Sequence, residues 1–186
     1  MRVVAGSARG RRLQTPPGLD VRPTTDRVRE ATFNALGSLD VVQGASVLDL
    51  FAGSGALGIE ALSRGAGHAT FVDSSPRALA AVRDNLATCG LDDAATVVRA
   101  DAFAHLAVHP EHHDLALLDP PYAFDRWAEL LDAVRATVVV IESDRTIELP
   151  AGYTVRRERR YGGTVVTIAA QADRDDHGRR PPEDRS

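Results

Sequence analysis

Carboxylates and glycines recur where apolar runs end, a pattern that indicates a site for a small charged ligand. The run Val47–Phe51 is typical of a buried strand and leads directly into Gly53, Gly55 and Gly58. Glycines let the backbone bend and come close to a ligand, and a helix that starts there offers free N–H groups. This spacing, with Asp73 twenty residues after Gly53, fits the dinucleotide-binding fingerprint. An NAD enzyme would satisfy the pattern, so the ligand must be chosen on other residues.

Asp49 separates the candidate ligands by charge. It lies inside the strand, four positions before Gly53, where its carboxylate would repel a pyrophosphate. S-adenosylmethionine has no phosphate and a net positive charge, so it suits this position. Further carboxylates stand at or just beyond later strand ends, at Asp73, Asp101 and Asp119. Because ligands of open α/β sheets bind at the carboxyl ends of the strands, this acidic rim favours the cation.

The roles of the cofactor residues follow from their places in the chain. Gly53 and Gly55 would let the backbone approach the methionine moiety, and Asp73 would accept both ribose hydroxyls. Asp101 and the Ala102 backbone would meet the amino edge of the adenine. The full set that we expect to hold the cofactor is Asp49, Phe51, Ala52, Gly53, Ser54, Gly55, Asp73, Ser74, Asp101, Ala102 and Asp119.

A second chemical signal is the run Asp119, Pro120, Pro121 and Tyr122, which follows an apolar strand. Two prolines fix a rigid loop and remove two N–H groups, which leaves carbonyl oxygens as acceptors. The exocyclic amino group of a nucleobase is a poor nucleophile, because its lone pair is conjugated with the ring. Asp119 and the Pro120 carbonyl are expected to accept its two hydrogens, so that positioning supplies most of the rate. Tyr122 offers a face on which the base can stack, worth roughly 1–3 kcal/mol. The sequence thus predicts amino-group methylation with these four residues as the catalytic set.

Alternating strands and helices must position these residues. Apolar runs predict strands at 47–51, 69–72, 96–99, 114–118 and 137–141, with helices at 56–64, 76–88, 102–106 and 127–134 between them. The pattern then changes to an antiparallel hairpin, 153–161 with 164–170, joined at two glycines. Repeated β-α units predict a Rossmann-like α/β fold with a mostly parallel seven-stranded sheet that ends in this hairpin.

The ends of the chain carry different patterns. Residues 2–14 predict a small β-hairpin, and a helix capped by Thr24 or Thr25 follows it. We therefore divide the chain into an extension at 1–44, a main domain at 45–172 and a disordered tail at 173–186, which is charged and lacks apolar periodicity.

Composition limits the classes of protein. The chain has 186 residues, 44% of them hydrophobic, and a net charge of −4. One cysteine excludes an internal disulfide and a zinc site built from cysteines. No apolar run is long enough to span a membrane and the start is too short for a signal peptide, so we expect a cytoplasmic protein without a membrane partner. The loop that carries His109, His112 and His113 lacks a further ligand set, so we expect no metal.

The positive charges are unevenly distributed. All 22 basic residues are arginines, and they cluster in the first thirty positions and again at 156–160. Local basic patches, rather than net charge, bind phosphates. The second cluster falls on a predicted strand, where alternation favours a solvated edge over a second RNA site.

These motifs together resemble the RsmD family of bacterial small-subunit ribosomal RNA guanine-N2 methyltransferases. The resemblance covers about residues 2–170 and depends on RPTTDRVRE at 22–30 with Phe33 and Asn34, on 49–66, and on Asp119–Tyr122. The glycine and proline motifs are shared by many amino-methylating enzymes, whereas the arginine-rich helix start is more specific to this family.

The resemblance implies a class I methyltransferase fold, S-adenosylmethionine as donor and S-adenosylhomocysteine as product. It implies one guanine of 16S rRNA as acceptor, presented by the 30S subunit or an assembly intermediate. The sequence does not give the oligomeric state, and we expect a monomer as the simplest case. We then expect Arg9, Arg11 and Arg12 to grip RNA phosphates. Another three residues, Arg22, Thr24 and Arg29, would lie closer to the cofactor and the target base.

Several alternatives stay open on the sequence alone. An adenine-N6 or protein-glutamine methyltransferase is the nearest, although such enzymes commonly have Asn where Asp119 stands. A non-catalytic RNA- or nucleotide-binding module would not need the run Asp119–Tyr122. Asp49 and the lack of a hydride-transfer partner disfavour an NAD-dependent oxidoreductase.

Overall fold

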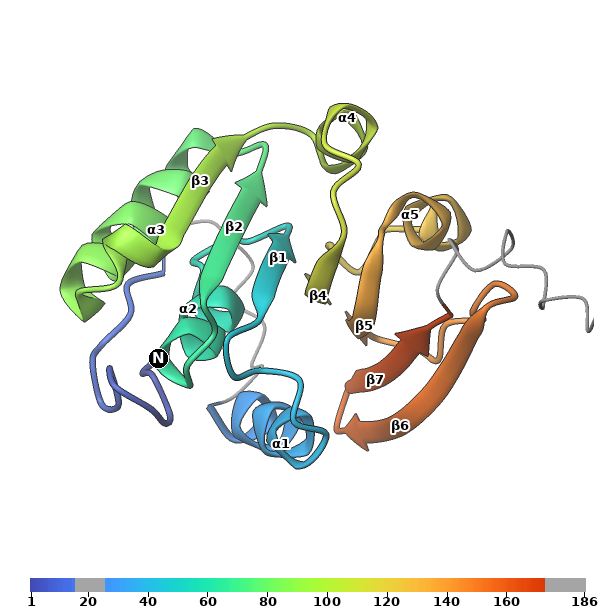
Figure 1. Cartoon of the computed structure of the whole chain (residues 1–186), viewed down its shortest axis with the longest axis horizontal. Helices are drawn as coiled ribbons and strands as arrows, with labels where there is room; N and C mark the ends of the chain where they lie inside the picture. The colour runs from blue at the N-terminus through green and yellow to red at the C-terminus, as the bar shows by residue number, and fades with distance from the viewer. Residues whose placement is uncertain (16–25, 173–186) are drawn as a thin grey trace, which may run out of the picture.

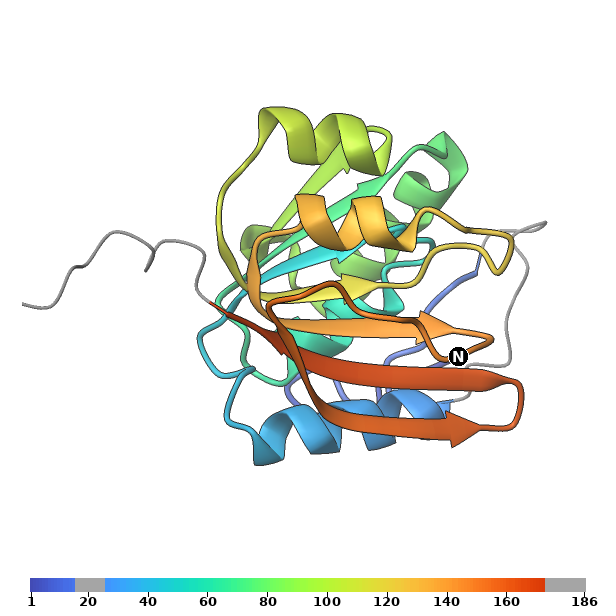
Figure 2. The same ribbon diagram turned by 90° about the vertical axis from the view of Figure 1, so that its right-hand side faces the viewer.

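The computed structural model describes residues 1–15 and 26–172, which form one seven-stranded sheet with helices on both faces (Figures 1 and 2). The strand order is β3-β2-β1-β4-β5-β7-β6. Strands β1 to β5 are parallel to their neighbours, while β7 runs antiparallel to both β5 and β6. The predicted mostly parallel sheet with a C-terminal antiparallel hairpin is confirmed.

The elements lie close to their predicted places. The strands are β1 (Ser46–Leu50), β2 (His68–Asp73), β3 (Ala95–Arg99), β4 (His113–Leu118), β5 (Ala136–Ser143), β6 (Tyr153–Tyr161) and β7 (Thr164–Gln171). The helices are α1 (Asp26–Ser38), α2 (Ala56–Ser63), α3 (Pro76–Cys89), α4 (Ala102–Val108) and α5 (Trp127–Ala133), with a short 3-10 helix at Asp92–Ala94. Helix α3 shows how local sequence sets the ends of an element. Ser75 caps its first turn by accepting from the Ala78 N–H, and Gly90 ends it at a φ of 67°.

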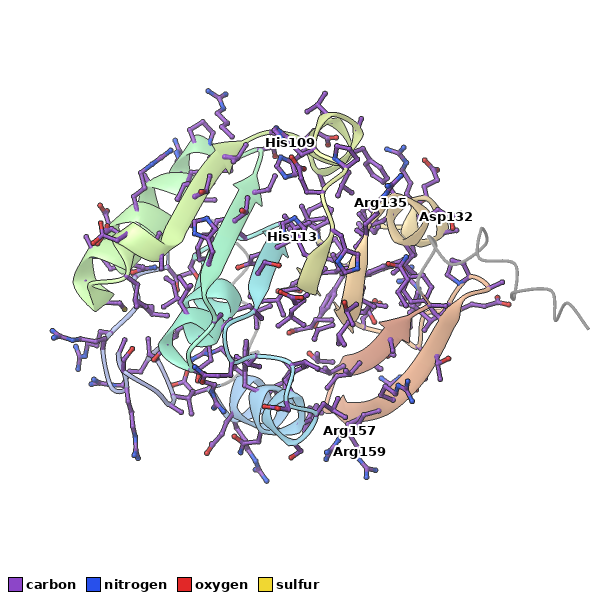
Figure 3. The ribbon with its side chains drawn as sticks, viewed as in Figure 1. His109, His113, Asp132, Arg135, Arg157 and Arg159 are labelled. Atoms are coloured by element: carbon purple, nitrogen blue, oxygen red, sulfur yellow. The ribbon has the colours of Figure 1, made fainter. Side chains whose placement is uncertain are left out.

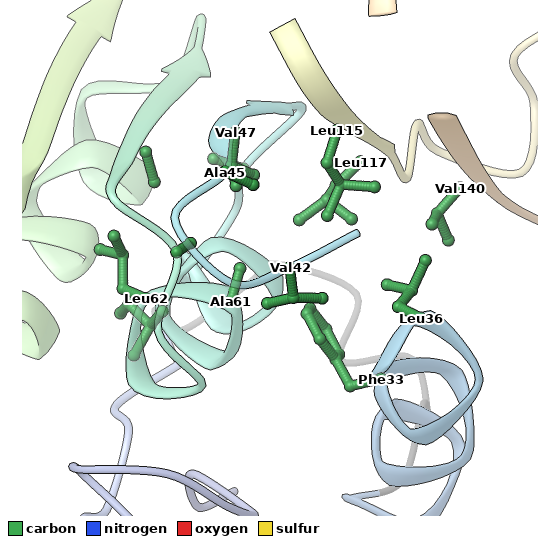
Figure 4. Close-up of a cluster of buried hydrophobic side chains, with 14 of the residues drawn as sticks. Phe33, Leu36, Val42, Ala45, Val47, Ala61, Leu62, Leu115, Leu117 and Val140 are labelled. Atoms are coloured by element: carbon green, nitrogen blue, oxygen red, sulfur yellow. The ribbon is translucent and has the colours of Figure 1, made fainter. Parts of the chain in front are cut away.

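Alternate residues of the strands feed two separate cores. Val47 of β1 and Leu117 of β4 face α1, α2 and α3, where Phe33 and Leu36 of α1 complete the cluster drawn in Figure 4. Leu48 of β1 points to the other face, where α4 and α5 cover it. Both faces of the central strands β1, β4 and β5 are therefore buried, as their continuous apolar sequences predict. In the described ranges no helix has the length and apolar character needed to cross a membrane.

The N-terminal segment is less regular than the predicted hairpin. Its strand pairing consists of a single antiparallel bridge between Arg2 and Arg12. The N–H groups of Val4 and Ala5 donate to the Glu60 carboxylate of α2, at 2.8 and 3.1 Å. Backbone hydrogen bonds from Val3 to Arg11, from Gly10 to Val3 and from Leu13 to Met1 join the two ends of the segment, so it forms a short hairpin that is also docked on α2. The proposed caps Thr24 and Thr25 and the tail 173–186 lie outside the described residues.

Glu60 is the centre of a buried charge network that fastens this segment. Its side chain is fully buried and pairs with Arg29 of α1 at 3.4 Å and with Arg64 at 2.8 Å. Arg29 also pairs with Asp26 at 2.9 Å and donates to the Arg2 carbonyl oxygen. Three elements, the N-terminal segment, α1 and α2, therefore meet on one carboxylate.

We expect Glu60→Gln to lower the free energy of unfolding by about 3 kcal/mol, because Arg29 stays buried without its full counter-charge. Chemical denaturation measures this change. Glu30→Gln, an exposed acid on α1, is the matched control and should be nearly neutral. Equal stabilities of the two variants would show that the network contributes little to folding.

Candidate active site

The carboxyl ends of the parallel strands bring the predicted site residues to one edge of the sheet. Leu50, at the end of β1, is in register with Val72 of β2 on one side and Leu118 of β4 on the other. Asp73 and Asp119 each follow directly after these partners, so they flank the turn that leaves β1. The chain order reverses between β1 and β4, which is where open α/β sheets form their ligand crevice.

The glycine turn has the predicted backbone, with one addition. Gly53 and Gly55 adopt φ angles of 57° and 77°, in the left-handed region that glycine enters freely. Phe51 also has a positive φ, 62°, which is rare for a residue with a side chain and costs about 1–3 kcal/mol. Strained backbone of this kind clusters at ligand sites. The sequence does not reveal this strain at Phe51, because its signal is a backbone angle.

Asp73 supports the turn directly. One carboxylate oxygen accepts from the Gly53 N–H at 2.9 Å, and the other accepts from the Ser75 N–H at 2.8 Å. Asn85 of α3 adds a second support, since its amide donates to the Ser54 carbonyl at 2.8 Å. The turn is thus fixed from β2 and from α3. Its shape is set before any ligand arrives, and the ribose contact of Asp73 stays a prediction.

Asp49 lies beneath the turn rather than on its open side. Its side chain is 1% exposed, and one oxygen accepts from the Gly58 N–H in the first turn of α2 at 3.0 Å. Burial, reinforced by the charge of Asp73 and opposed by the Gly58 hydrogen bond, raises the pKa of Asp49 to about 8. The carboxyl is therefore mostly protonated at neutral pH in the free protein. A cation placed nearby would favour the ionised form.

Asp101 occupies the start of α4, just beyond β3. One of its carboxylate oxygens accepts from the N–H groups of Phe103 and Ala104, at 2.9 and 3.1 Å, and so caps the helix. Ala102, the first residue of that helix, is buried. The cap fixes where the Asp101 side chain stands, on the same edge as the glycine turn. Its contact with an adenine remains a prediction.

The loop after β4 carries the predicted catalytic residues in a fixed shape. Asp119 is half-buried, Pro120 is buried, and Pro121 and Tyr122 are exposed. The Pro121 carbonyl accepts from the Phe124 N–H at 2.8 Å, so this oxygen is not the open acceptor that the two prolines suggested. The Tyr122 hydroxyl lies 3.2 Å from the Thr164 hydroxyl, which ties the loop to the start of β7.

An aromatic cluster that the sequence did not single out joins this loop to the cofactor side. Phe124 makes an edge contact with Phe51 at 5.5 Å and a stacked contact with Phe103 at 6.3 Å, measured between ring centres. It also meets Trp127 of α5 at 5.2 Å, and the Arg126 guanidinium covers the Phe103 ring at 3.9 Å. The ends of β1, β3 and β4 are thereby packed together. Only the position of Phe124, two residues after Tyr122, hinted at this role.

The predicted RNA-contacting arginines divide into two groups. Arg9, Arg11 and Arg12 are exposed on the N-terminal segment, which leaves them accessible to a large partner. Arg29 is 2% exposed and committed to the Glu60 network, so the prediction that it contacts RNA is wrong. Its burial follows from its place on the inner face of α1. Arg22 and Thr24 lie outside the described residues.

The loop with His109, His112 and His113 and the single cysteine were the other candidate groups in the sequence. Within residues 1–15 and 26–172, no group of three or more His, Cys, Asp or Glu side chains is placed to hold a metal ion. Cys89 is half-buried near the end of α3, and burial raises the pKa of its thiol.

The sheet order, the glycine turn after β1 and the acidic strand ends define a class I methyltransferase. Solved structures agree with this class. The Escherichia coli protein yhhF superposes with a TM-score of 0.82 at 36% identity, over 92% of this chain and 98% of that one. The RNA methyltransferase-like protein PH1948 of Pyrococcus horikoshii, at a TM-score of 0.71 and 18% identity over 88% of this chain and 93% of that one, shares the fold.

The sequence comparisons identify the family. The model of the family described as "Conserved hypothetical protein 95" matches residues 1–170. Ribosomal RNA small subunit methyltransferase D of Escherichia coli (strain K12) is 36% identical over 178 residues, 90% of this chain and 88% of its own length. The Bacillus subtilis protein YlbH is 41% identical over 181 residues, 90% of this chain and 97% of its own. The chain belongs to this family, the RsmD family of methyltransferases.

Proposed function

We propose that this protein transfers a methyl group from S-adenosylmethionine to the exocyclic N2 amino group of one guanine in bacterial 16S rRNA. The observation that carries the proposal is the placement of Asp119–Tyr122 beside the glycine turn, at the switch point of the sheet. The relative from Escherichia coli named as an rRNA small subunit methyltransferase supports the substrate class. Asp119, where adenine-N6 and glutamine enzymes commonly have Asn, favours guanine.

The residues at the sheet edge fit S-adenosylmethionine. The turn bends at Gly53 and Gly55, and a Cβ at Gly53 would meet little of the protein. Asp73 supports the turn with its carboxylate, and Asp49 beneath the turn would ionise when a cation binds. That charge would oppose a dinucleotide pyrophosphate and suits a cation. When bound, S-adenosylmethionine supplies a methyl group already activated by its sulfonium charge.

The chain's own residues then act by holding the acceptor. The Asp119 carboxylate and the Pro120 carbonyl accept the two hydrogens of the amino group, which directs its lone pair toward the methyl donor. Asp119 would also take the proton that the nitrogen loses once the N–C bond has formed. Tyr122 offers its ring to the base, since its hydroxyl is anchored on Thr164 while 40% of the residue stays exposed. The rate would come mainly from this positioning.

Arg9, Arg11 and Arg12 of the N-terminal segment would bind the phosphates of the RNA. These side chains are exposed, and the segment that carries them is fixed on α2 through Glu60 and Ser63. We further propose that the substrate is a partly assembled small subunit and that the enzyme acts as a cytoplasmic monomer.

Methyl transfer from labelled cofactor tests the proposed function. The acceptors are 16S rRNA transcribed in vitro and 30S particles that lack the modification, with the product mapped to the nucleotide. We expect label on the N2 amino group of a single guanine. Label on an adenine or on protein, or no transfer to either acceptor, would contradict the proposal.

A further inference from the structure

Strand β6 forms the outer edge of the sheet and carries four arginines, at 156, 157, 159 and 160. All of its residues from 154 to 160 are exposed. The cross-strand register assigns them to faces. Arg157 is opposite Ile168 and Arg159 is opposite Val166, both of which belong to the core on the α1 side. These two arginines therefore share the face of the sheet that α1 covers.

The two faces of β6 differ in how their charges are compensated. On the far face, Glu158 accepts from the hydroxyls of Thr146 and Thr167, at 3.0 Å each, and Arg160 donates to the Asp144 carbonyl at 3.4 Å. On the α1 side, none of the ion pairs found among residues 1–15 and 26–172 includes Arg157 or Arg159. Figure 3 shows both side chains beside α1, at the border of the molecule.

Arg157 and Arg159 form one side of a shallow groove between β6 and α1. Ala31 and Ala35 of α1 line its other side, and Val166 and Ile168 of β7 also line it. Small residues on the helix leave the stems and heads of the two arginines open to a ligand. The groove has a volume of about 10 Å³, room for about one water molecule, so an RNA strand would lie across it and meet the two exposed arginines rather than enter it.

The groove runs toward the active site. Strand β6 ends at Tyr161, which also lines the groove, and the turn that follows leads to Thr164. The Thr164 hydroxyl lies 3.2 Å from that of Tyr122 in the catalytic loop. The end of β6 therefore reaches the edge at which the target base would be held.

The same face also carries the arginines of the N-terminal segment. Val3, Ala8 and Leu13 of that segment are buried in the core shared with α1, as are Val166 and Ile168 of β7. The N-terminal segment, which carries Arg9, Arg11 and Arg12, lies on one side of α1 in Figure 1, and Arg157 and Arg159 lie on the other side in Figure 3. An RNA that follows both would cross α1 with the active site at its edge.

We propose that Arg157 and Arg159 form a second contact surface for the RNA backbone, on the side of the active site opposite the N-terminal arginines. This inference rests on the proposed function, since it assumes that RNA is the substrate. It replaces the expectation that residues 156–160 are only a solvated edge. Each arginine contacts a phosphate, so both add to affinity without reading the base.

The test measures how RNA affinity depends on salt. Binding of in vitro transcribed 16S rRNA is followed by filter retention between about 50 and 200 mM salt. For Arg157→Gln with Arg159→Gln, we expect the slope of log Kd against log salt to fall by about 1.4, since each lost contact to single-stranded RNA removes about 0.7. KM for RNA should rise while kcat at saturating RNA stays unchanged.

Three controls distinguish the loss of a phosphate contact from the loss of any exposed arginine and from misfolding. Arg135→Gln removes one exposed arginine between α5 and β5 (Figure 3) and should leave the slope unchanged. Replacement of both arginines by lysine keeps the charge and should retain the slope. Binding of S-adenosylhomocysteine, measured by calorimetry, shows that each variant is folded. If the double variant no longer binds it, the two single variants are tested instead, and each is expected to lower the slope of log Kd against log salt by about 0.7.

The outcomes also separate this inference from the proposed function. If the wild type binds and methylates rRNA and the glutamine variants have its salt slope, the second contact surface does not exist and the proposed function stands. The surface is equally excluded if the glutamine variants aggregate while their monomers bind RNA normally, because the arginines would then only protect an edge strand. If the wild type neither binds nor methylates rRNA, both proposals fail together.

Discussion

Asp119→Ala is expected to lower kcat for methyl transfer by about 10²–10³-fold, the usual effect of removing one preorganised polar group at a reacting centre. The carboxylate stands directly after β4, in a loop held by the hydrogen bond from the Phe124 N–H to the Pro121 carbonyl and by the Tyr122–Thr164 contact. These two contacts do not involve the Asp119 side chain, so they remain possible in the variant. Cofactor affinity should change much less than kcat.

Single-turnover kinetics with labelled cofactor measure this effect apart from product release. Asp119→Asn keeps one acceptor oxygen and should fall between alanine and wild type. Asp125→Ala, an exposed acid a few residues further along, is the matched control and should be close to wild type. An Asp119→Ala enzyme with wild-type kcat would exclude Asp119 from the chemistry.

Asp49→Asn is expected to weaken S-adenosylmethionine binding by about 30- to 1000-fold, or roughly 2–4 kcal/mol, the range for one partner of a buried charge pair. The asparagine oxygen can still accept from the Gly58 N–H, as Asp49 does at 3.0 Å, so the turn is preserved. What the variant loses is the negative charge beneath the turn.

The pH dependence gives a second, independent readout. Because burial raises the pKa of Asp49 to about 8, the free protein holds a proton there at neutral pH. A bound cation favours the ionised carboxylate, so binding releases this proton. Affinity should therefore rise with pH by up to about tenfold per unit below pH 8 and then level off. Calorimetry in buffers of different ionisation enthalpy counts the released protons.

The variant should lose most of that proton release, and its stability should change in the opposite direction from its affinity. A carboxyl whose pKa is raised on folding contributes stability that is present below its unfolded pKa and is lost as pH rises toward 8. The free Asp49→Asn protein should thus be at least as stable as wild type at neutral pH. Asp84→Asn, exposed on α3, controls for the change of one charge. Unchanged affinity and proton release would exclude Asp49 from cofactor binding.

Local sequence determined most of the fold and part of the site. Alternating apolar strands and capped helices fixed the elements to within a few residues, because burial on both faces demands continuous apolar strands. Ser75, Pro76 and Gly90 marked the ends of α3 by their own backbone preferences. The glycine turn and Asp119–Tyr122 were visible for the same reason, since short-range chemistry specifies them.

Only the tertiary structure decided how distant residues are used. It buried Arg29 on Glu60, because the register of α1 against α2 turns that side chain inward. It bound the backbone of Val4 and Ala5 to the same carboxylate, which docks the short N-terminal hairpin on α2. It also joined Phe51, Phe103 and Phe124 into one cluster, and it placed Arg157 and Arg159 on the face of α1. These outcomes depend on contacts between segments far apart in the chain, which residue type and spacing along one segment do not encode.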